Sequence, residues 1–200
     1  MELVLGTHNA KKRGELVDLL APFGITLKTL AYFPNALTVD ETGTTFAANA
    51  ALKAGEQAAH LQRWVLGEDS GLCVEALSGA PGVYSARFSG PEATDAKNNE
   101  LLMAKLAGVA AEKRTAYYVC SAALADPTGT IRATAEGRCH GVLRTEPSGA
   151  GGFGYDPYFE IREYHRTFAE LGATVKAVLS HRARAIREML PLILRHLTAD

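Results

Sequence analysis

The sequence predicts an α/β protein built on a mixed β-sheet. Two observations predict it. Short apolar runs alternate with segments of helical periodicity in the first half of the chain, and two long apolar runs surround a turn signal in the second half. Alternation is typical of parallel β-α-β units, whereas runs joined by a tight turn form an antiparallel hairpin. The 200 residues suit one domain, residues 1–200, or two closely packed lobes without a linker.

The elements of the first half follow from periodicity and from turn residues. Short apolar runs predict strands over residues 2–7, 25–30 and 63–68. Leucines at helical spacing predict a helix within residues 10–24. An alanine-rich run without proline predicts a second helix over residues 44–61, with a threonine available as its N-cap.

The second half adds the hairpin and two further helices. Residues 96–108 have an amphipathic pattern that Gly108 closes. Residues 115–143 predict two long strands around the turn DPTG, and residues 180–197 carry apolar side chains at helical spacing. Because proline lacks an N–H and clashes with the preceding turn, Pro191 should kink this last helix or divide it.

Composition narrows the class of protein. Hydrophobic residues make up 47% and charged residues 22%, as in an ordinary soluble protein. The net charge of −1 offers no general attraction for polyanions, so we expect no nucleic-acid partner. Cys73, Cys120 and Cys139 lack CxxC spacing, which disfavours a disulfide framework or zinc cage and favours a reducing cytoplasm. We find no signal peptide and no apolar run of about 18 residues, so we expect no membrane attachment.

The first candidate site is GTHNAKK, residues 6–12, between an expected strand and an expected helix. The N–H groups and dipole of a helix N-terminus can hold phosphate. Thr7 and Asn9 add hydrogen-bonding groups, and Lys12 adds a positive charge one turn further on. The alternative is an ordinary N-cap beside solvated lysines, since the glycine run of a P-loop is missing.

Two acidic pairs form the second candidate site. Asp40 and Glu41 precede a helix, and Glu68 and Asp69 end a strand. Magnesium usually takes one or two protein carboxylates together with phosphates and waters. Solvated caps are the alternative. Asp69 is the strongest candidate, because it precedes Ser-Gly at the strand end, where α/β sheets usually bind ligands.

The third candidate site is GGFGYDP, residues 151–157. Glycine lets the backbone approach a flat ligand closely, and Phe153 offers a stacking face. The alternative is a glycine-rich bend with Phe153 and Tyr155 buried in the core.

The fourth candidate site is SHR, residues 180–182, at the start of the last expected helix. Ser180 is placed to cap that helix, and His181 and Arg182 lie in its first turn. Cations in that position oppose the helix dipole. Their placement suggests a compensating anion or acceptor, or else a surface salt bridge.

Together the four sites are the parts of a nucleoside triphosphate site, and their motifs resemble the inosine/xanthosine triphosphate pyrophosphatases. The resemblance runs from residue 3 to about residue 190. The motifs occur in the family's order: THNAKK, ETGTTFAANAALKA, EDSGLCVEALSGAPGVYSARFSG, ATDAKNN, EGRCHGVL, GGFGYDPYF, TFAEL and SHRARA.

The resemblance implies both an architecture and a reaction. The architecture is an elongated mixed sheet flanked by helices, in two lobes with a nucleotide cleft between them, in a homodimer. The reaction converts ITP, dITP and XTP to the monophosphate and pyrophosphate. Mg²⁺ is the implied cofactor, held by Glu41 and Asp69. Asp69 is also the implied catalytic base, which prepares the attacking water.

The resemblance also implies the groups that bind the nucleotide. Thr7, Asn9 and Lys12 match the triphosphate-binding motif, and the stretch from Phe153 to Asp156 closes on the purine. Donors such as Arg182 and backbone N–H groups suit the O6 and N7 acceptors of these purines and reject adenine. The implied substrate-binding residues are Thr7, His8, Asn9, Ala10, Lys11, Lys12, Lys53, Ser70, Phe153, Gly154, Tyr155, Asp156, Lys176, His181 and Arg182.

The sequence departs from the family pattern at three single positions and in the segment LGATVKAVL, residues 171–179, which replaces the usual acidic lead to SHR. Glu68 replaces an aspartate of the family pattern, Ala48 replaces a glutamate, and Ser148 replaces an arginine. Two alternatives remain. One alternative is a Maf-like pyrophosphatase with another base preference, against which GGFGYDP and SHRARA argue. The other is a nucleotide-binding sensor without turnover. The joint presence of the two implied metal carboxylates and the motif lysine argues against it.

Overall fold

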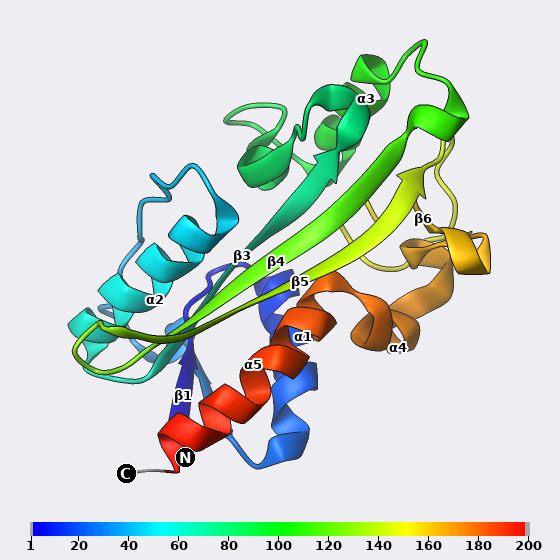
Figure 1. The fold of residues 1–200 in the computed structure, drawn as a ribbon. Helices are drawn as coiled ribbons and strands as arrows, with labels where there is room; N and C mark the ends of the chain where they lie inside the picture. The colour runs from blue at the N-terminus through cyan, green and yellow to red at the C-terminus, as the bar shows by residue number, and fades with distance from the viewer. Residues whose placement is uncertain (1, 199–200) are drawn as a thin grey trace. The chain divides into compact units, whose positions relative to one another are not determined.

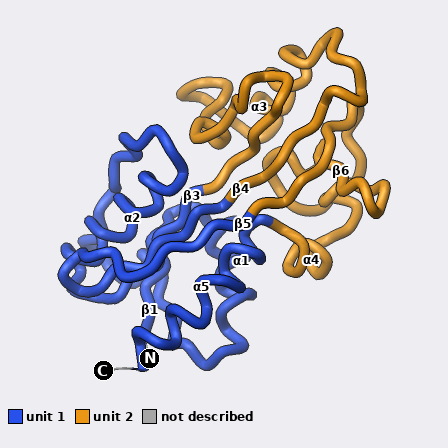
Figure 2. Tube along the Cα trace, in the orientation of Figure 1, with its two compact units in different colours: residues 1–69, 120–137, 181–200 blue, residues 70–119, 138–180 orange. Residues whose placement is uncertain are grey.

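The computed structural model describes residues 2–198, and the chain divides into two compact units (Figure 2). Unit 1 comprises residues 1–69, 120–137 and 181–200, and unit 2 comprises residues 70–119 and 138–180. Three strands run from one unit into the other: β3 (Val65–Val74), β4 (Thr115–Ala125) and β5 (Ile131–Leu143).

The strands of the described chain form one mixed sheet, in the order β2-β1-β3-β4-β5-β6-β7. The remaining strands are β1 (Glu2–Leu5), β2 (Thr26–Thr29), β6 (Phe159–Ile161) and β7 (Arg166–Thr167). β1 pairs in parallel with β2 and β3, whereas β6 pairs antiparallel with β5 and β7. The predicted α/β class with a mixed sheet is thereby confirmed. The single domain over 1–200, the elongated shape and the nucleotide cleft stay predictions.

The predicted helices are present, with shorter bounds. The described α-helices are α1 (Ala10–Leu20), α2 (Phe46–Leu61), α3 (Asp95–Lys105), α4 (Phe168–Leu179) and α5 (His181–Leu197). α1 stops before Pro22, and a short 3₁₀ turn then ends at Gly24 with φ +69°. In α2, Thr45 is the N-cap and accepts a hydrogen bond from the Ala48 N–H, as the threonine-rich start predicts.

Two features of the C-terminal third differ from the sequence prediction. Helix α4 was not predicted as an element, although Thr167 and Glu170 form a capping box at its start and Gly172 interrupts it at φ +77°. Pro191 lies inside α5 without dividing it, so that alternative was wrong. The buried side chains of Met189 and Ile193 on either side hold the helix against the core despite the lost N–H.

In unit 1, helices cover both faces of the sheet at β1 and β3, which gives three layers there (Figure 1). On β1, Leu3 and Leu5 pack against α1 and α5, while Val4 between them packs against α2. On β3, Leu66 faces α1 and α5, whereas Val65 faces α2. Successive side chains of a strand point to opposite faces, so nearly continuous apolar runs are required here.

Unit 2 encloses a separate hydrophobic cluster that is rich in aromatic rings. Tyr118, Phe159 and Phe168 pack together, with the Phe159 and Phe168 ring centres 5.6 Å apart. Leu102 of α3 and Tyr155 of the GGFGYDP loop belong to the same cluster. Among residues 2–198, no helix is long and apolar enough to span a bilayer.

Candidate active site

The two acidic residues of β3 point to opposite faces of the sheet in unit 1. Glu68 continues the face of Leu66, toward α1 and α5, and Asp69 continues the face of Val65, toward α2. Both are buried, with exposures of 1% and 4%. Strand alternation therefore gives the neighbouring carboxylates different partners, apart from Lys12, which reaches both.

Asp69 is held by polar side chains of α2. Asn49 Nδ2 donates to Asp69 Oδ2 at 3.2 Å, and Lys53 Nζ donates to Asp69 Oδ1 at 3.0 Å. The same Lys53 Nζ lies 3.3 Å from Glu41 Oε1. The structure thus brings together Glu41, Lys53 and Asp69, although they lie far apart in the sequence.

Burial and neighbouring charges shift the pKa values of Asp69 and Lys53 in opposite directions. Burial raises the pKa of Asp69, and the nearby charges of Lys53 and Lys12 offset only part of that rise. Burial acts to lower the pKa of Lys53, but Asp69, Glu68 and Glu41 together raise it. Asp69 therefore has a higher affinity for a proton than an ordinary aspartate, next to a lysine that keeps its charge.

Glu68 is held by cations from the other face. Its Oε1 lies 3.2 Å from Lys12 Nζ, and its Oε2 lies 3.5 Å from Arg182 Nη2. The Cys120 thiol also donates to Oε2, at 3.4 Å. Burial acts to raise the pKa of Glu68, but the charges of Lys12, Arg182 and Lys53 together lower it below its usual value. Lys12 lies 4.0 Å from Asp69 Oδ1 as well, so it contacts both carboxylates of β3.

Arg182 is 1% exposed and pairs with Glu15 of α1 in addition to Glu68. These two carboxylates supply the compensating anion that the position of Arg182 in the first turn of α5 suggested. Its predicted role as a donor to the purine stays a prediction. His181 beside it is also buried, at 4% exposure.

The GTHNAKK segment behaves partly as an ordinary helix start. Asn9 is the N-cap of α1, and its Oδ1 accepts from the N–H groups of Lys11 and Lys12 at 3.0 and 3.1 Å. His8, Ala10 and Lys11 are exposed. Lys12 is not a solvated lysine, because its side chain is 14% exposed and paired with the β3 carboxylates.

In unit 2, the GGFGYDP loop is built around Asp156. This carboxylate is 1% exposed and accepts from Lys176 Nζ at 2.6 Å and from the Phe153 N–H at 2.9 Å. A Cβ at Gly152, where φ is +73°, would collide with Asp156 Oδ2. Gly152 is therefore glycine for two reasons: backbone conformation and the close approach of this carboxylate.

The two aromatic residues of this loop differ in their environments. Tyr155 is 4% exposed, belongs to the hydrophobic cluster and donates its hydroxyl to the Ser85 carbonyl at 2.8 Å. Phe153 is half-buried, and Lys176 Nζ lies 4.3 Å from its ring centre. The core alternative thus describes Tyr155 but not Phe153, whose ring remains partly accessible.

Sequence reasoning missed Asn49 and Glu15. It included Glu68 in the second candidate site and among the departures from the family pattern, but not among the implied metal or substrate-binding residues. Glu68 had a usable signal: a carboxylate inside a strand buried on both faces requires cationic partners. Asn49 and Glu15 had no signal of that kind, because only the packing of α2 and α1 on the sheet brings them to their partners. Ser70 follows Asp69 on β3 and is half-buried.

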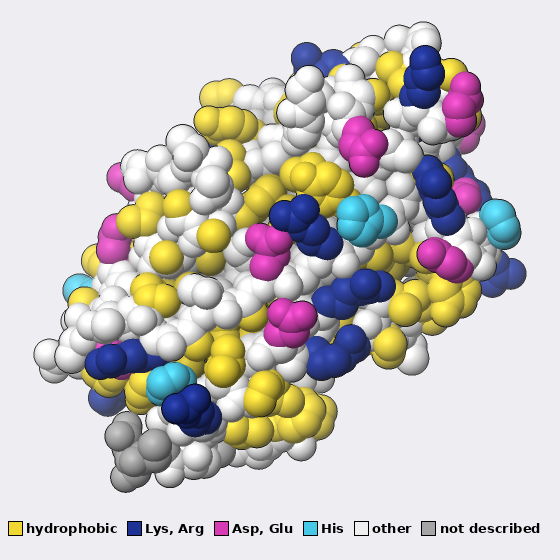
Figure 3. All heavy atoms as spheres, in the orientation of Figure 1, with side chains coloured by type: hydrophobic (Ala, Val, Ile, Leu, Met, Phe, Trp, Pro, Cys, Tyr) yellow, Lys and Arg dark blue, Asp and Glu magenta, His cyan; other side chains and the backbone are white. Residues whose placement is uncertain are grey.

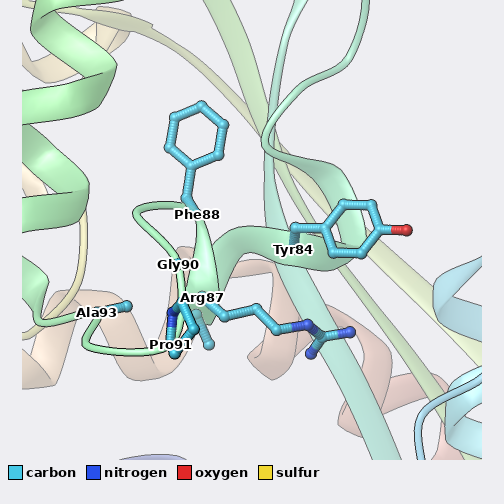
Figure 4. A pocket seen from close by; sticks show the side chains of 7 residues that line it. Tyr84, Arg87, Phe88, Gly90, Pro91 and Ala93 are labelled. Atoms are coloured by element: carbon cyan, nitrogen blue, oxygen red, sulfur yellow. The ribbon is translucent and has the colours of Figure 1, made fainter.

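A separate cavity of about 680 Å³ in unit 2 involves none of the predicted site residues. It is lined by Tyr84, Ala86, Arg87, Phe88, Gly90, Pro91 and Ala93. The Arg87 guanidinium lies 5.2 Å from the centre of the Tyr84 ring, and Figure 4 shows Phe88 pointing away from that pair. The acid–base cluster of β3 is thus distinct from this cavity.

Comparison with known proteins identifies the family. A model of the Ham1 family matches residues 3–192. A dITP/XTP pyrophosphatase from Rhodopirellula baltica is 54% identical over 194 residues, covering 97% of this chain and 93% of the relative. A protein of the same name from Exiguobacterium is 50% identical over 192 residues, covering 94% and 95%. A solved HAM1 protein structure from Coxiella burnetii has a TM-score of 0.88 at 34% identity, covering 98% and 99% of the two chains. The resemblance found in the sequence motifs is confirmed, and the chain belongs to the Ham1 family.

Proposed function

We propose that this protein is a hydrolase of acid anhydrides that converts ITP, dITP and XTP to the nucleoside monophosphate and pyrophosphate. Its membership of the Ham1 family and its similarity to relatives named dITP/XTP pyrophosphatase support this reaction. The observation that carries the proposal is the buried Asp69, with Lys53 at 3.0 Å and Lys12 at 4.0 Å.

Asp69 acts as the general base of the proposed reaction. It takes a proton from water while the water oxygen bonds to the α-phosphorus, and the bond from that phosphorus to the oxygen of pyrophosphate breaks. Its raised pKa favours this role, since a base whose pKa lies closer to the working pH accepts a proton more readily. Lys12 and Lys53 bind phosphate oxygens and stabilise the charge that develops on them.

Mg²⁺ is the proposed cofactor, and the donor set of this chain suits it. No group of three or more His, Cys, Asp and Glu side chains in residues 2–198 is arranged to hold a metal. The oxygens of Glu41 and Asp69 instead converge on one cation, Lys53 Nζ. Magnesium typically takes one or two carboxylates and completes its shell with phosphate and water. When bound, it would neutralise charge on the phosphoryl oxygens.

The purine is recognised by stacking and by donors. The partly accessible ring of Phe153 suits a flat base, and a base–aromatic stack tolerates any purine. Discrimination between purine bases therefore depends on hydrogen-bond donors to O6 and N7. We propose that Arg182 and backbone N–H groups are these donors. Adenine presents an amino group at position 6 and leaves such donors unpaired.

The proposed function is tested by pyrophosphate release from ITP, dITP, XTP, GTP and ATP in the presence of Mg²⁺. We expect rapid release from the first three and slow release from ATP. Equal release from ATP and ITP would contradict the base selectivity. Tight nucleotide binding without release from any of the five would instead favour the sensor alternative.

Asp69→Asn should abolish hydrolysis while leaving nucleotide binding largely intact. Asparagine keeps the shape of the side chain but neither accepts the proton from water nor offers magnesium a full charge. The measurements are pyrophosphate release and ITP affinity for both proteins. Near-normal turnover in the variant would remove Asp69 from the mechanism.

We propose further that the protein is a cytoplasmic homodimer. The family resemblance supports the dimer, and the scattered cysteines support a reducing compartment. Light scattering after size-exclusion chromatography should give twice the mass of the chain. A monomer at micromolar concentration would contradict the dimer, and recovery outside the cytoplasm on fractionation would contradict the location.

A further inference from the structure

Helix α3 lies beside the GGFGYDP loop in unit 2 and binds both backbone polar groups of one loop residue, Gly154. Asp95 Oδ2 accepts from the Gly154 N–H at 3.0 Å, and Asn99 Nδ2 donates to the Gly154 carbonyl at 2.9 Å. Asp95 and Asn99 are four residues apart, one helical turn, so both face the loop from the same side of α3. Their two bonds fix the position of Gly154 at both ends of the residue.

Gly154 is the residue between the two aromatic rings of the loop. Gly154 has a left-handed backbone conformation, with φ at +61°. A Cβ at this position would meet no atom within 4 Å. The hydrogen bonds from α3 act directly on this backbone and oppose its rotation. Tyr155 on one side is fixed in the core, whereas Phe153 on the other side is half-buried.

The Phe153 ring is placed by its backbone and by Lys176, whose Nζ lies 4.3 Å from the ring centre. Among the described residues, it lies outside the hydrophobic cluster that holds Tyr155. Its own N–H is bound by Asp156 at 2.9 Å, and its carbonyl accepts from the Asp156 N–H at 3.2 Å. The bonds to Gly154 extend this anchoring to the next residue of the chain.

Only one end of the Asn99 amide has a hydrogen-bond partner in the described chain. Its side chain is buried, at 9% exposure, and its Oδ1 has no hydrogen-bond partner within residues 2–198. Buried polar atoms are rarely left in this state, because the lost hydration is not repaid. Within the described residues, the orientation of the amide is set by the donation from Nδ2 to the Gly154 carbonyl.

We propose that Asp95 and Asn99 are positioning residues for the purine: they hold Gly154 so that the Phe153 ring is pre-set to stack on the base. The inference rests on the proposed function, because it takes Phe153 as the stacking residue. The proposed role of both residues is confined to the purine end of the substrate, so their loss should weaken base recognition and spare the chemical step.

The experiment compares Asn99→Ala and Asp95→Ala with wild type in the full chain. We expect the KM for ITP to rise about tenfold, the effect of one lost hydrogen bond to a pre-organised site. The kcat should change by less than about twofold, and the inhibition constant of pyrophosphate should stay unchanged, since pyrophosphate has no base. Asp95→Asn keeps an oxygen acceptor for the Gly154 N–H and should restore a KM near that of wild type.

Two further variants separate positioning from a general loss of structure. Glu100→Ala changes an exposed residue of the same helix and should leave the KM and melting temperature at wild-type values. Adding Asn99→Ala to Phe153→Ala should cause no further rise in KM, because the ring that Asn99 positions is already gone. Melting temperatures show whether each variant is folded.

The outcomes are distinct from those that test the reaction itself. If wild-type protein releases no pyrophosphate from ITP, the proposed function fails. If wild-type protein is active, an unchanged KM in both alanine variants overturns the positioning role. An additional tenfold loss in the Phe153→Ala background, or equal losses for ITP and pyrophosphate, would overturn it as well.

Discussion

At the scale of single residues, environment separates side chains that look equivalent in the sequence. Phe153 and Tyr155 are two residues apart in one glycine-rich loop, yet one is half-buried and the other is part of the core. Glu68 and Asp69 are adjacent, and burial acts on both. The charges of Lys12 and Arg182 lower the pKa of Glu68, whereas the pKa of Asp69 is raised.

Phe153→Ala should weaken ITP binding by about 1–3 kcal/mol, the range for losing one base–aromatic stack. Pyrophosphate affinity should barely change, because the residues proposed for the phosphates are untouched. Melting temperature, ITP affinity and pyrophosphate affinity are the three measurements. A core phenylalanine would lose about 3–5 kcal/mol of folding stability instead, with parallel losses for both ligands.

At the scale of elements, close approach of helices to strands depends on particular glycines. A Cβ at Gly67 of β3 would lie 2.5 Å from the Ala50 carbonyl oxygen and 2.6 Å from the Ala54 nitrogen of α2. Gly137 of β5 has the same relation to the start of α5. The helices carrying Lys53 and Arg182 thus approach the sheet closely enough for these side chains to reach the β3 carboxylates.

Gly137→Ala should lower the free energy of unfolding by about 1–3 kcal/mol, the usual cost of overpacking. The added methyl would collide with the His181 oxygen and the Ala185 nitrogen, which are backbone atoms and cannot move aside alone. Gly14→Ala is the matched control. A Cβ there meets nothing within 4 Å inside α1, so it should stabilise the protein by about 0.5–1 kcal/mol. Equal urea midpoints for the two variants would contradict this account.

The turn of the β4–β5 hairpin carries a pH-dependent contribution to stability. Asp126 Oδ1 accepts from the Thr128 N–H at 2.9 Å and its hydroxyl at 2.6 Å, and Arg132 Nε lies 2.6 Å from Oδ2. Burial acts to raise the pKa of Asp126, but the bonds from Thr128 and Arg132 lower it to about 2. A lowered pKa means that the ionised carboxylate stabilises the folded state above the unfolded pKa of about 3.9, and that this contribution disappears as pH falls toward 2.

Asp126→Asn should therefore be less stable than wild type near neutral pH, and the difference should shrink in acid. We expect the difference in unfolding free energy to fall by about 1–2 kcal/mol between about pH 6 and about pH 2, allowing for the exposure of Arg132. Urea unfolding of both proteins across this range measures it. A constant difference would show that the turn depends on shape and not on the charge of Asp126.

At the scale of the whole molecule, positive and negative charges nearly balance, with a net charge of −1. On the face shown in Figure 3, Lys and Arg side chains lie among Asp and Glu side chains. The charged cluster of β3, by contrast, is buried and compensated internally, since Lys53 and Lys12 pair with its carboxylates. The predicted absence of a nucleic-acid partner stays a prediction.

Removal of divalent metal should abolish hydrolysis without unfolding the protein. Glu41 and Asp69 already contact Lys53, so the fold does not need Mg²⁺ to offset their repulsion. We expect chelation to stop pyrophosphate release and to shift the melting temperature by less than about 2 °C. Full activity in excess chelator, or a large loss of thermal stability, would contradict the proposed role of the metal.

The sequence by itself determined the fold class, the family and most of the helices and strands that the structure contains. Apolar runs buried on both faces, the Thr45 cap and the DPTG turn are local signals, because they depend on propensities within a few residues. The motif run also identified the Ham1 relationship, since a long ordered series of matches does not depend on knowing any contact. Helix α4 escaped prediction although its capping box was present at Thr167 and Glu170.

Only the tertiary structure decided which charged side chains form ion pairs. The sequence placed Glu68, Arg182 and Glu15 far apart or in different motifs, and their pairing arises because α1 and α5 pack on the same face of β3. The hydrogen bonds of Asp95 and Asn99 to Gly154 likewise join residues more than 50 positions apart. Electrostatic partners depend on distances across the fold, which the packing of helices on the sheet sets and local sequence patterns do not encode.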